Sequence, residues 1–156
     1  MNKWFTGGGR PIEFRKIIKI IKKHSNNNGT ISVGTDSNVK KKKCVFSTAI
    51  CLHAAHGQNG GRYFISRKNA RSDNYSDLLQ RITAEVQKSV ELGLTLLEYC
   101  PTIKVELHLD VSKSDRGEKT SKFSDMLVGY AKGSGFECRV KPDAFAATSV
   151  ADKHSK

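Results

Sequence analysis

Four acidic residues in this sequence have the types and spacing expected of ligands for a divalent cation. Asp36 follows an apolar alternation in ISVGTDSN (31–38), and Asp110 follows another in IKVELHLD (103–110). If these segments are neighbouring parallel strands, the two carboxylates lie side by side at the carboxyl ends of the strands. Two such carboxylates repel each other unless a cation bridges them, and Mg²⁺ prefers oxygen ligands of this kind.

Glu85 and Asp152 are the further acids predicted to join this group. Glu85 lies on the flank of a long predicted helix, at the margin of its apolar face, although a salt bridge remains the alternative explanation. Asp152 lies in the last turn of a C-terminal helix, where the helix dipole disfavours a carboxylate. Taken alone, Asp152 is better explained as a solvent-exposed terminal residue. The convergence of the other three acids favours a ligand role instead.

The elements that must position these acids can be predicted from hydrophobic periodicity. A first amphipathic helix is expected over 12–24, with Pro11 in its first turn and the glycines at 7–9 as a flexible entry. Short turns then indicate an antiparallel meander of three strands. The strands are expected at about 30–36, 44–53 and 61–67, followed by helix 74–99, strand 103–110, helix 118–132, strand 136–140 and a last helix after Pro142.

This order of elements predicts an α/β fold with a mixed sheet and helices packed on it. A chain of 156 residues is long enough to bury a core of its own. We therefore expect one domain over 1–156, in which 1–29 form an N-terminal arm and helix.

The charge of the chain favours a polyanionic partner. The sequence has 27 Lys and Arg against 15 Asp and Glu, a formal net charge of +12. Nucleic acid is favoured over a membrane surface, because no predicted helix combines aromatic and basic residues as a surface anchor does. No apolar run approaches the roughly 20 residues of a membrane span. The N-terminus lacks the apolar core of a signal peptide and the four cysteines are scattered, so a cytoplasmic protein with reduced thiols is expected.

Several segments resemble the YkuK-type ribonuclease H-like family over nearly the whole chain. They are VGTDSN (33–38), the acid-bearing long helix, VELHLDVS (105–112) and KPDAFAATSVADKHSK (141–156). The resemblance implies a five-stranded mixed sheet whose first three strands are antiparallel, with helices on both faces. It also implies acids on the first strand, the following helix, the fourth strand and the C-terminal helix. Here these are Asp36, Glu85, Asp110 and Asp152. The chain departs from the family in a shorter N-terminal part and a more basic composition.

The leading hypothesis is a metal-dependent nuclease that uses two Mg²⁺ or Mn²⁺ ions bound by Asp36, Glu85, Asp110 and Asp152. One ion would activate water for in-line attack on a phosphodiester and the other would stabilise the leaving 3′ oxygen. Asp36 would bridge both ions. His154 is a candidate for proton transfer or product release, with a simple surface residue as the alternative. A non-catalytic nucleic-acid-binding module on the same fold is the alternative function.

The basic residues near the predicted meander are candidates for contacts with the nucleic-acid backbone. The lysine run 40–43 is also compatible with an ordinary solvated turn. Ser37 and Asn38 are candidates for contacts with a phosphate or a ribose 2′-hydroxyl, so RNA, an RNA–DNA hybrid and structured DNA are all expected partners. The backbone-contacting candidates are Lys40, Lys41, Lys42, Lys43, Arg62, Arg67, Lys68 and Arg71.

Overall fold

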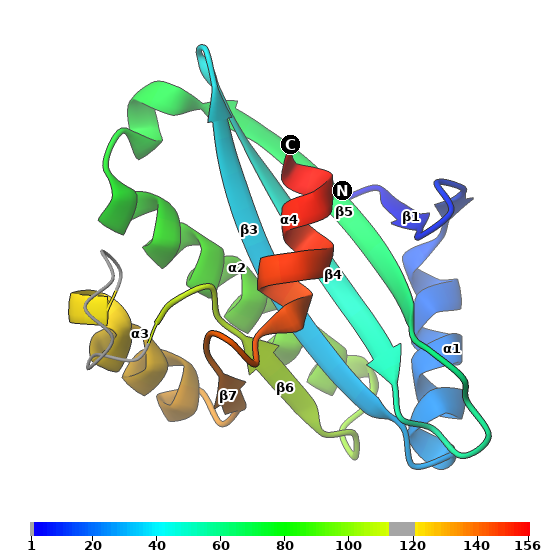
Figure 1. Cartoon of the computed structure of the whole chain (residues 1–156). Helices are drawn as coiled ribbons and strands as arrows, with labels where there is room; N and C mark the ends of the chain where they lie inside the picture. Colours follow the sequence, from blue (N-terminus) through cyan, green and yellow to red (C-terminus); the bar gives the residue numbers. More distant parts are fainter. Residues whose placement is uncertain (1, 113–120) are drawn as a thin grey trace.

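The computed structural model describes residues 2–112 and 121–156, and in these residues seven strands form one mixed sheet (Figure 1). The order across the sheet is β2-β1-β5-β4-β3-β6-β7. The predicted α/β class and mixed sheet are therefore confirmed. The predicted number of five strands is wrong, because two short N-terminal strands extend one edge of the sheet.

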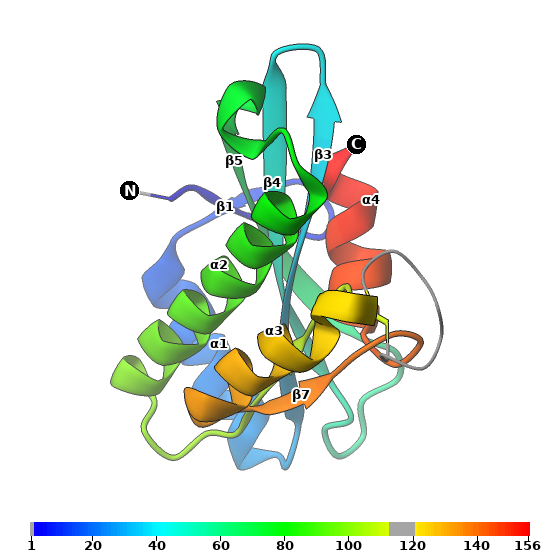
Figure 2. The ribbon, with the colours of Figure 1, turned by 90° about the vertical axis from the view of Figure 1, so that its left-hand side faces the viewer.

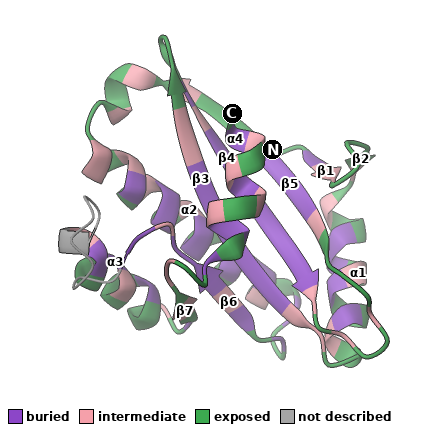
Figure 3. Ribbon diagram, in the orientation of Figure 1, coloured by how far each residue is buried: buried purple, intermediate pink, exposed green. Residues whose placement is uncertain are grey.

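The central meander consists of β3 (Thr30–Lys40), β4 (Lys43–His53) and β5 (Arg62–Arg71), which are antiparallel as predicted. The prediction that the first strand ends at Asp36 is wrong. Pairing between β3 and β4 continues as far as Lys40 and Lys43, so a two-residue turn joins the strands. The continuing ladder satisfies the backbone groups beyond Asp36, although the residues there become progressively more exposed toward Lys40 (Figure 3).

Two short strands that run parallel to β3 extend the sheet beyond β3, at the edge away from β4. These are β6 (Val105–His108) and β7 (Glu137–Arg139), and β6 pairs with β3 from Ile31 to Gly34. The predicted parallel pairing of the two acid-bearing segments is therefore confirmed. However, β6 ends at His108, short of the predicted end at Asp110. Beyond this point β3 runs on past the end of its neighbour.

The N-terminal arm differs from the prediction. β1 (Trp4–Thr6) and β2 (Pro11–Ile12) form a hairpin that pairs with β5, and the glycines at 7–9 lie in its turn. A flexible entry was expected there. Gly9 has a φ of 91°, a backbone conformation that glycine adopts without strain. Pro11 belongs to β2, not to the first helical turn as predicted, and α1 (Phe14–Asn26) begins after Glu13.

Helices lie on both faces of the sheet (Figure 2). One face carries α1, α2 (Leu78–Tyr99) and α3 (Ser121–Gly133). The predicted start of the long helix at 74 is too early, because Ser72–Tyr75 form the 3₁₀ turn η1. The side chain of Asp77 then caps α2 by accepting a 2.7 Å hydrogen bond from the Leu79 amide. Residues 118–120 of the predicted second helix lie outside the described residues.

The other face carries the C-terminal π-helix η3 (Ala146–Ala151), which continues into α4 (Asp152–Ser155). It packs on the sheet through a small cluster of apolar side chains that includes Ala49, Ile65 and Ala146. The main core lies on the opposite face, between the sheet and helices α1 and α2. Within the described residues, no helix has the length and apolar character needed to cross a membrane.

Candidate metal centre

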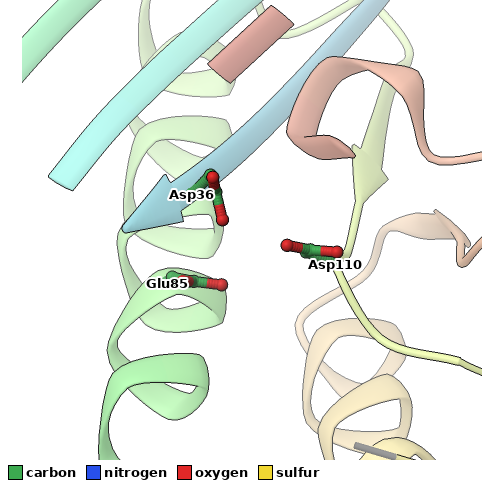
Figure 4. Close-up of side chains that lie close together, drawn as sticks. All are labelled: Asp36, Glu85 and Asp110. Atoms are coloured by element: carbon green, nitrogen blue, oxygen red, sulfur yellow. The ribbon is translucent and has the colours of Figure 1, made fainter. Parts of the chain in front are cut away.

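Three acidic side chains from three different elements converge beside β3. Asp36 lies on β3, Glu85 lies on α2 and Asp110 follows the end of β6 (Figure 4). Each offers a carboxylate oxygen, and these three oxygens all lie within 4.8 Å of one another. The structure therefore brings together three of the four acids that the sequence predicts as metal ligands.

The lengths of the strands create the space in which these acids meet. β6 ends beside Gly34, so Asp36 lies two residues past the last residue of β3 that pairs with β6. Asp110 comes two residues after the end of β6 and lies across this opening from Asp36 (Figure 4). Glu85 approaches from α2 beneath the sheet. Asp36 and Glu85 are each only 6% exposed.

The surroundings make ionisation of this group unfavourable. Burial raises the pKa of Asp36 to about 8, with further contributions from the carboxyl groups of Asp152 and Asp110. Burial also raises the pKa of Glu85 well above its ordinary value, and the nearby charge of Asp36 adds to this effect. Near neutral pH these carboxyl groups therefore favour either a bound proton or a bound cation.

Asp152 lies next to the three-acid group. It interacts with Asp36 closely enough to raise the pKa of that residue, but its own side chain is 36% exposed. One of its carboxylate oxygens lies 3.2 Å from Nζ of Lys156, the residue one helical turn later. The C-terminal helix thus places a fourth acid at the outer side of the centre.

Other side chains that contact the acids were not predicted in these roles. Oγ of Ser37 donates a 2.6 Å hydrogen bond to Glu85, and Oγ of Ser155 donates a 3.2 Å hydrogen bond to Asp36. Nζ of Lys141 lies 3.1 Å from Oδ1 of Asp110. Ser37 was predicted only as a nucleic-acid contact. Of the contacts described for the four acids, only the Asp152–Lys156 pair could have been predicted from the sequence, because residues four apart are neighbours on a helix.

His154 points toward β5. Its Nε2 lies 2.9 Å from the hydroxyl of Tyr63, and its Nδ1 lies 3.2 Å from a guanidinium nitrogen of Arg67. Its backbone carbonyl also accepts a 2.8 Å hydrogen bond from Arg67. Both ring nitrogens are therefore engaged by the sheet. The predicted role of His154 in proton transfer stays a prediction.

The structure gathers some of the predicted nucleic-acid contacts and separates others. Lys40 to Lys43 form the exposed tip of the β3–β4 hairpin, and Arg71 pairs with Lys43 across the β4–β5 ladder. Asn38 lies on β3 between this tip and Asp36. Arg62 lies at the other end of β5, where its guanidinium group stacks over the Phe64 ring.

Arg67 and Lys68 are consecutive residues of β5, so their side chains point to opposite faces of the sheet. Arg67 contacts the C-terminal segment that contains His154, while Lys68 lies on the face covered by α2. The eight predicted basic contacts therefore do not form one continuous surface. Among these predicted contacts, the lysines at the tip of the β3–β4 hairpin lie at the end of the strand that carries Asp36.

These features define a ribonuclease H-like protein. Residues 13–156 match the model of the family described as ribonuclease H-like, and the chain belongs to this family. It is similar to the protein named "Uncharacterized protein YkuK" of Bacillus subtilis (strain 168), with 26% identity over 157 aligned residues. The alignment covers 90% of this chain and 87% of that relative. No solved structure gives a significant match. The resemblance inferred from the sequence is confirmed.

Proposed function

We propose that this protein is a metal-dependent nuclease that hydrolyses phosphodiester bonds in RNA or in an RNA–DNA hybrid. The observation that carries this proposal is the convergence of the Asp36, Glu85 and Asp110 carboxylates within 4.8 Å. Membership of the ribonuclease H-like family supports it, since this fold is commonly that of a nuclease. The formal net charge of +12 is consistent with a polyanionic substrate.

The residues present fit a hard divalent cation. The donor set consists of carboxylate oxygens, which suit Mg²⁺ and Mn²⁺. Two of the carboxyl groups have a raised pKa, and a bound cation would offset the unfavourable burial of their charge. Asp36, Glu85 and Asp110 would hold the metal, and Asp152 would complete the group. Bound divalent ions would activate water and stabilise the leaving oxygen of the phosphodiester.

The remaining side chains of the centre would orient the ligands and the substrate. Ser37 holds Glu85 and Ser155 holds Asp36, so each buried carboxylate has a fixed direction. Lys141 brings a positive charge beside Asp110, where it would attract a phosphate of the substrate. The lysines at 40–43 would bind the backbone farther along the strand without reading its sequence.

Cleavage of labelled nucleic acids tests the proposal. RNA–DNA hybrid, double-stranded RNA, single-stranded RNA and branched DNA would be incubated with wild-type protein in Mn²⁺ and in EDTA. We expect cleavage only with the metal, and a loss of at least about 10³-fold in Asp36→Asn and Asp110→Asn. Asp125→Asn is the matched control, because it removes an exposed acid on α3. It should cleave like the wild type.

One result would contradict the proposal. Wild-type protein that cleaves none of these substrates in Mn²⁺, yet binds them in a salt-dependent manner that Asp36→Asn does not change, would be a non-catalytic nucleic-acid-binding module.

A further inference from the structure

A groove lies on the sheet face that carries α1 and α2, away from η3 and α4. Its volume is about 1260 Å³. The N-terminal hairpin and the start of α1 form one wall, and the C-terminal half of α2 forms the other. Side chains of β4 and β5 that point away from η3, among them Phe46 and Lys68, form the floor. No part of the proposed metal centre lines this groove.

The additional N-terminal strands β1 and β2 form much of the wall opposite α2. Residues 4–12, which form the β1–β2 hairpin, precede the segment 13–156 that matches the family. Trp4 on β1 packs against Phe14 with ring centroids 5.9 Å apart. Phe14 in turn meets Tyr99 of α2 edge-on at 5.8 Å. The hairpin thus completes a row of three aromatic rings, of which Tyr99 is 55% exposed.

The groove also carries an excess of positive charge. Its cations are Lys3, Arg15, Lys68 and Lys88, and its acids are Glu13 and Glu91. Glu13 lies 3.4 Å from Arg15, so that acid already has a cationic partner. The charges that remain are therefore mainly those of lysines.

Lys68 and Lys88 approach each other from β5 and α2. The ammonium group of Lys88 lies 4.9 Å from the centre of the Phe46 ring, a contact that keeps it at the floor of the groove. Partial burial lowers the pKa of Lys88, and the positive charge of Lys68 lowers it further. Glu91 opposes this effect only in part. An anion placed between the two lysines would relieve their repulsion.

We propose that this groove binds single-stranded nucleic acid, with a backbone phosphate at Lys68 and Lys88 and bases against Phe14 and Tyr99. Aromatic rings beside a basic groove are the means by which proteins hold single strands, because unpaired bases expose their faces for stacking. The volume exceeds the roughly 300–1000 Å³ of small-molecule pockets, which suits a few nucleotides better than one small ligand. This inference rests on the proposed function, because the choice of nucleic acid as the bound polymer comes from it.

The groove and the metal centre share helix α2. Lys88 follows Glu85 by three residues on α2, so less than one helical turn separates a groove cation from a proposed metal ligand.

Binding of labelled oligouridylate of about 12 nucleotides, measured by fluorescence anisotropy in EDTA, tests the inference without cleavage. Lys68→Gln/Lys88→Gln should weaken binding at least about tenfold and reduce the slope of log K against log salt by about 0.7, the value for one phosphate contact to a single strand. Tyr99→Ala, which leaves the charge unchanged, should weaken it at least about fivefold. Lys104→Gln/Lys132→Gln removes two exposed lysines outside the groove and should bind within about twofold of the wild type.

Trp4 provides a second measurement at the groove itself, because it is the single tryptophan of the chain. Its fluorescence should change when oligouridylate binds, and the change should disappear in Lys68→Gln/Lys88→Gln at the same oligonucleotide concentration. Equal weakening by the groove and control variants would overturn the inference. So would displacement of the oligonucleotide by polyglutamate at equal charge concentration, which would indicate a surface for acidic proteins.

The two proposals can fail separately. Groove binding in EDTA that persists in Asp36→Asn/Asp110→Asn, in a protein that cleaves nothing, would support the groove and contradict the nuclease. Metal-dependent cleavage that Lys68→Gln/Lys88→Gln and Tyr99→Ala leave unchanged, together with unchanged oligouridylate binding, would support the nuclease and overturn the groove.

Discussion

Ser37 on β3 donates a 2.6 Å hydrogen bond to the buried carboxylate of Glu85 on α2. Two residues earlier on the same strand, Thr35 lies 2.8 Å from the hydroxyl of Ser89, which is one turn farther along the helix. These two contacts lie on the same side of β3 and on one face of α2. They fix the position of the helix along the strand, and thereby the position of Glu85 beside Asp36.

Removal of the Ser37 hydroxyl should weaken metal binding. In Ser37→Ala the Glu85 carboxylate loses the hydrogen bond from the hydroxyl that helps to orient it, so we expect Mn²⁺ affinity to fall by about tenfold. The free energy of unfolding should fall by about 1 kcal/mol, because a buried side-chain hydrogen bond is lost. Isothermal titration calorimetry and urea denaturation measure the two effects. Ser76→Ala, at an exposed serine, should change neither, and unchanged Mn²⁺ affinity in Ser37→Ala would contradict the orienting role.

Gly34 allows β3 and η3 to approach each other closely. A Cβ atom at this position would lie 2.6 Å from the carbonyl carbon of Ala146 and closer still to the amide nitrogen of Ala147. Gly34→Ala should therefore lower the free energy of unfolding by about 3 kcal/mol or displace the C-terminal segment from the sheet. Displacement would separate Asp152 and Ser155 from Asp36, so Mn²⁺ affinity should fall as well.

Gly129 on α3 is the matched control for that substitution. No atom lies within 4 Å of a Cβ added there, and alanine is the better helix former by about 1 kcal/mol. Gly129→Ala should leave the stability unchanged or raise it slightly. A Gly34→Ala protein as stable as Gly129→Ala in urea denaturation would show that β3 and η3 are not in such close contact.

The acid positions could be predicted because each depends on local pattern. The alternation before Asp36 and before Asp110 indicates two strands, and the helical wheel places Glu85 at the edge of the apolar face. These three residues do converge in the structure. The end of β3 could not be predicted in the same way. A carboxylate suggests the end of a buried strand, whereas here the hairpin partner β4 continues the ladder past it.

Other features depend on contacts between distant segments and carry no local signal. Trp4–Thr6 and Pro11–Ile12 are too short to show a period of two, so the hairpin they form was not predicted. Lys141 meets Asp110 only because the segment after β7 runs beside the segment after β6, where the Lys141 amide donates a 2.9 Å hydrogen bond to Val111. Pairing of this kind is set by the register of the sheet.

The contacts of His154 predict a mainly structural effect of its substitution. His154→Ala would remove the contacts of the ring with Tyr63 and Arg67, so we expect the free energy of unfolding to fall by about 1–2 kcal/mol. If the nuclease proposal holds, cleavage measured well below the melting temperature should fall less than about tenfold, because a group that transfers protons contributes about 10²–10⁴-fold. A loss within that larger range, restored by added imidazole, would instead support the predicted catalytic role.

The raised pKa of Asp36 predicts how stability depends on pH. The folded protein keeps this carboxyl group protonated up to about pH 8, whereas the unfolded chain releases the proton near pH 4. Between these values the folded state binds more protons than the unfolded state. The free energy of unfolding in EDTA should therefore fall as the pH rises, by up to about 1.4 kcal/mol per pH unit from this group. Urea denaturation at several pH values from about 5 to about 8 measures the slope.

Asp36→Asn should remove the part of this slope that Asp36 contributes, because asparagine does not titrate. Glu85, the other buried acid of the centre, also has a raised pKa and keeps a smaller slope of the same sign. The variant should then be more stable than the wild type in EDTA near pH 8. Mn²⁺ should stabilise the wild type more at pH 8 than at pH 5, since the metal binds the ionised carboxylates and competes with their protons. Asp125→Asn, at an exposed acid, should keep the wild-type slope. An Asp36→Asn protein with the full wild-type slope would show that another group controls the pH dependence.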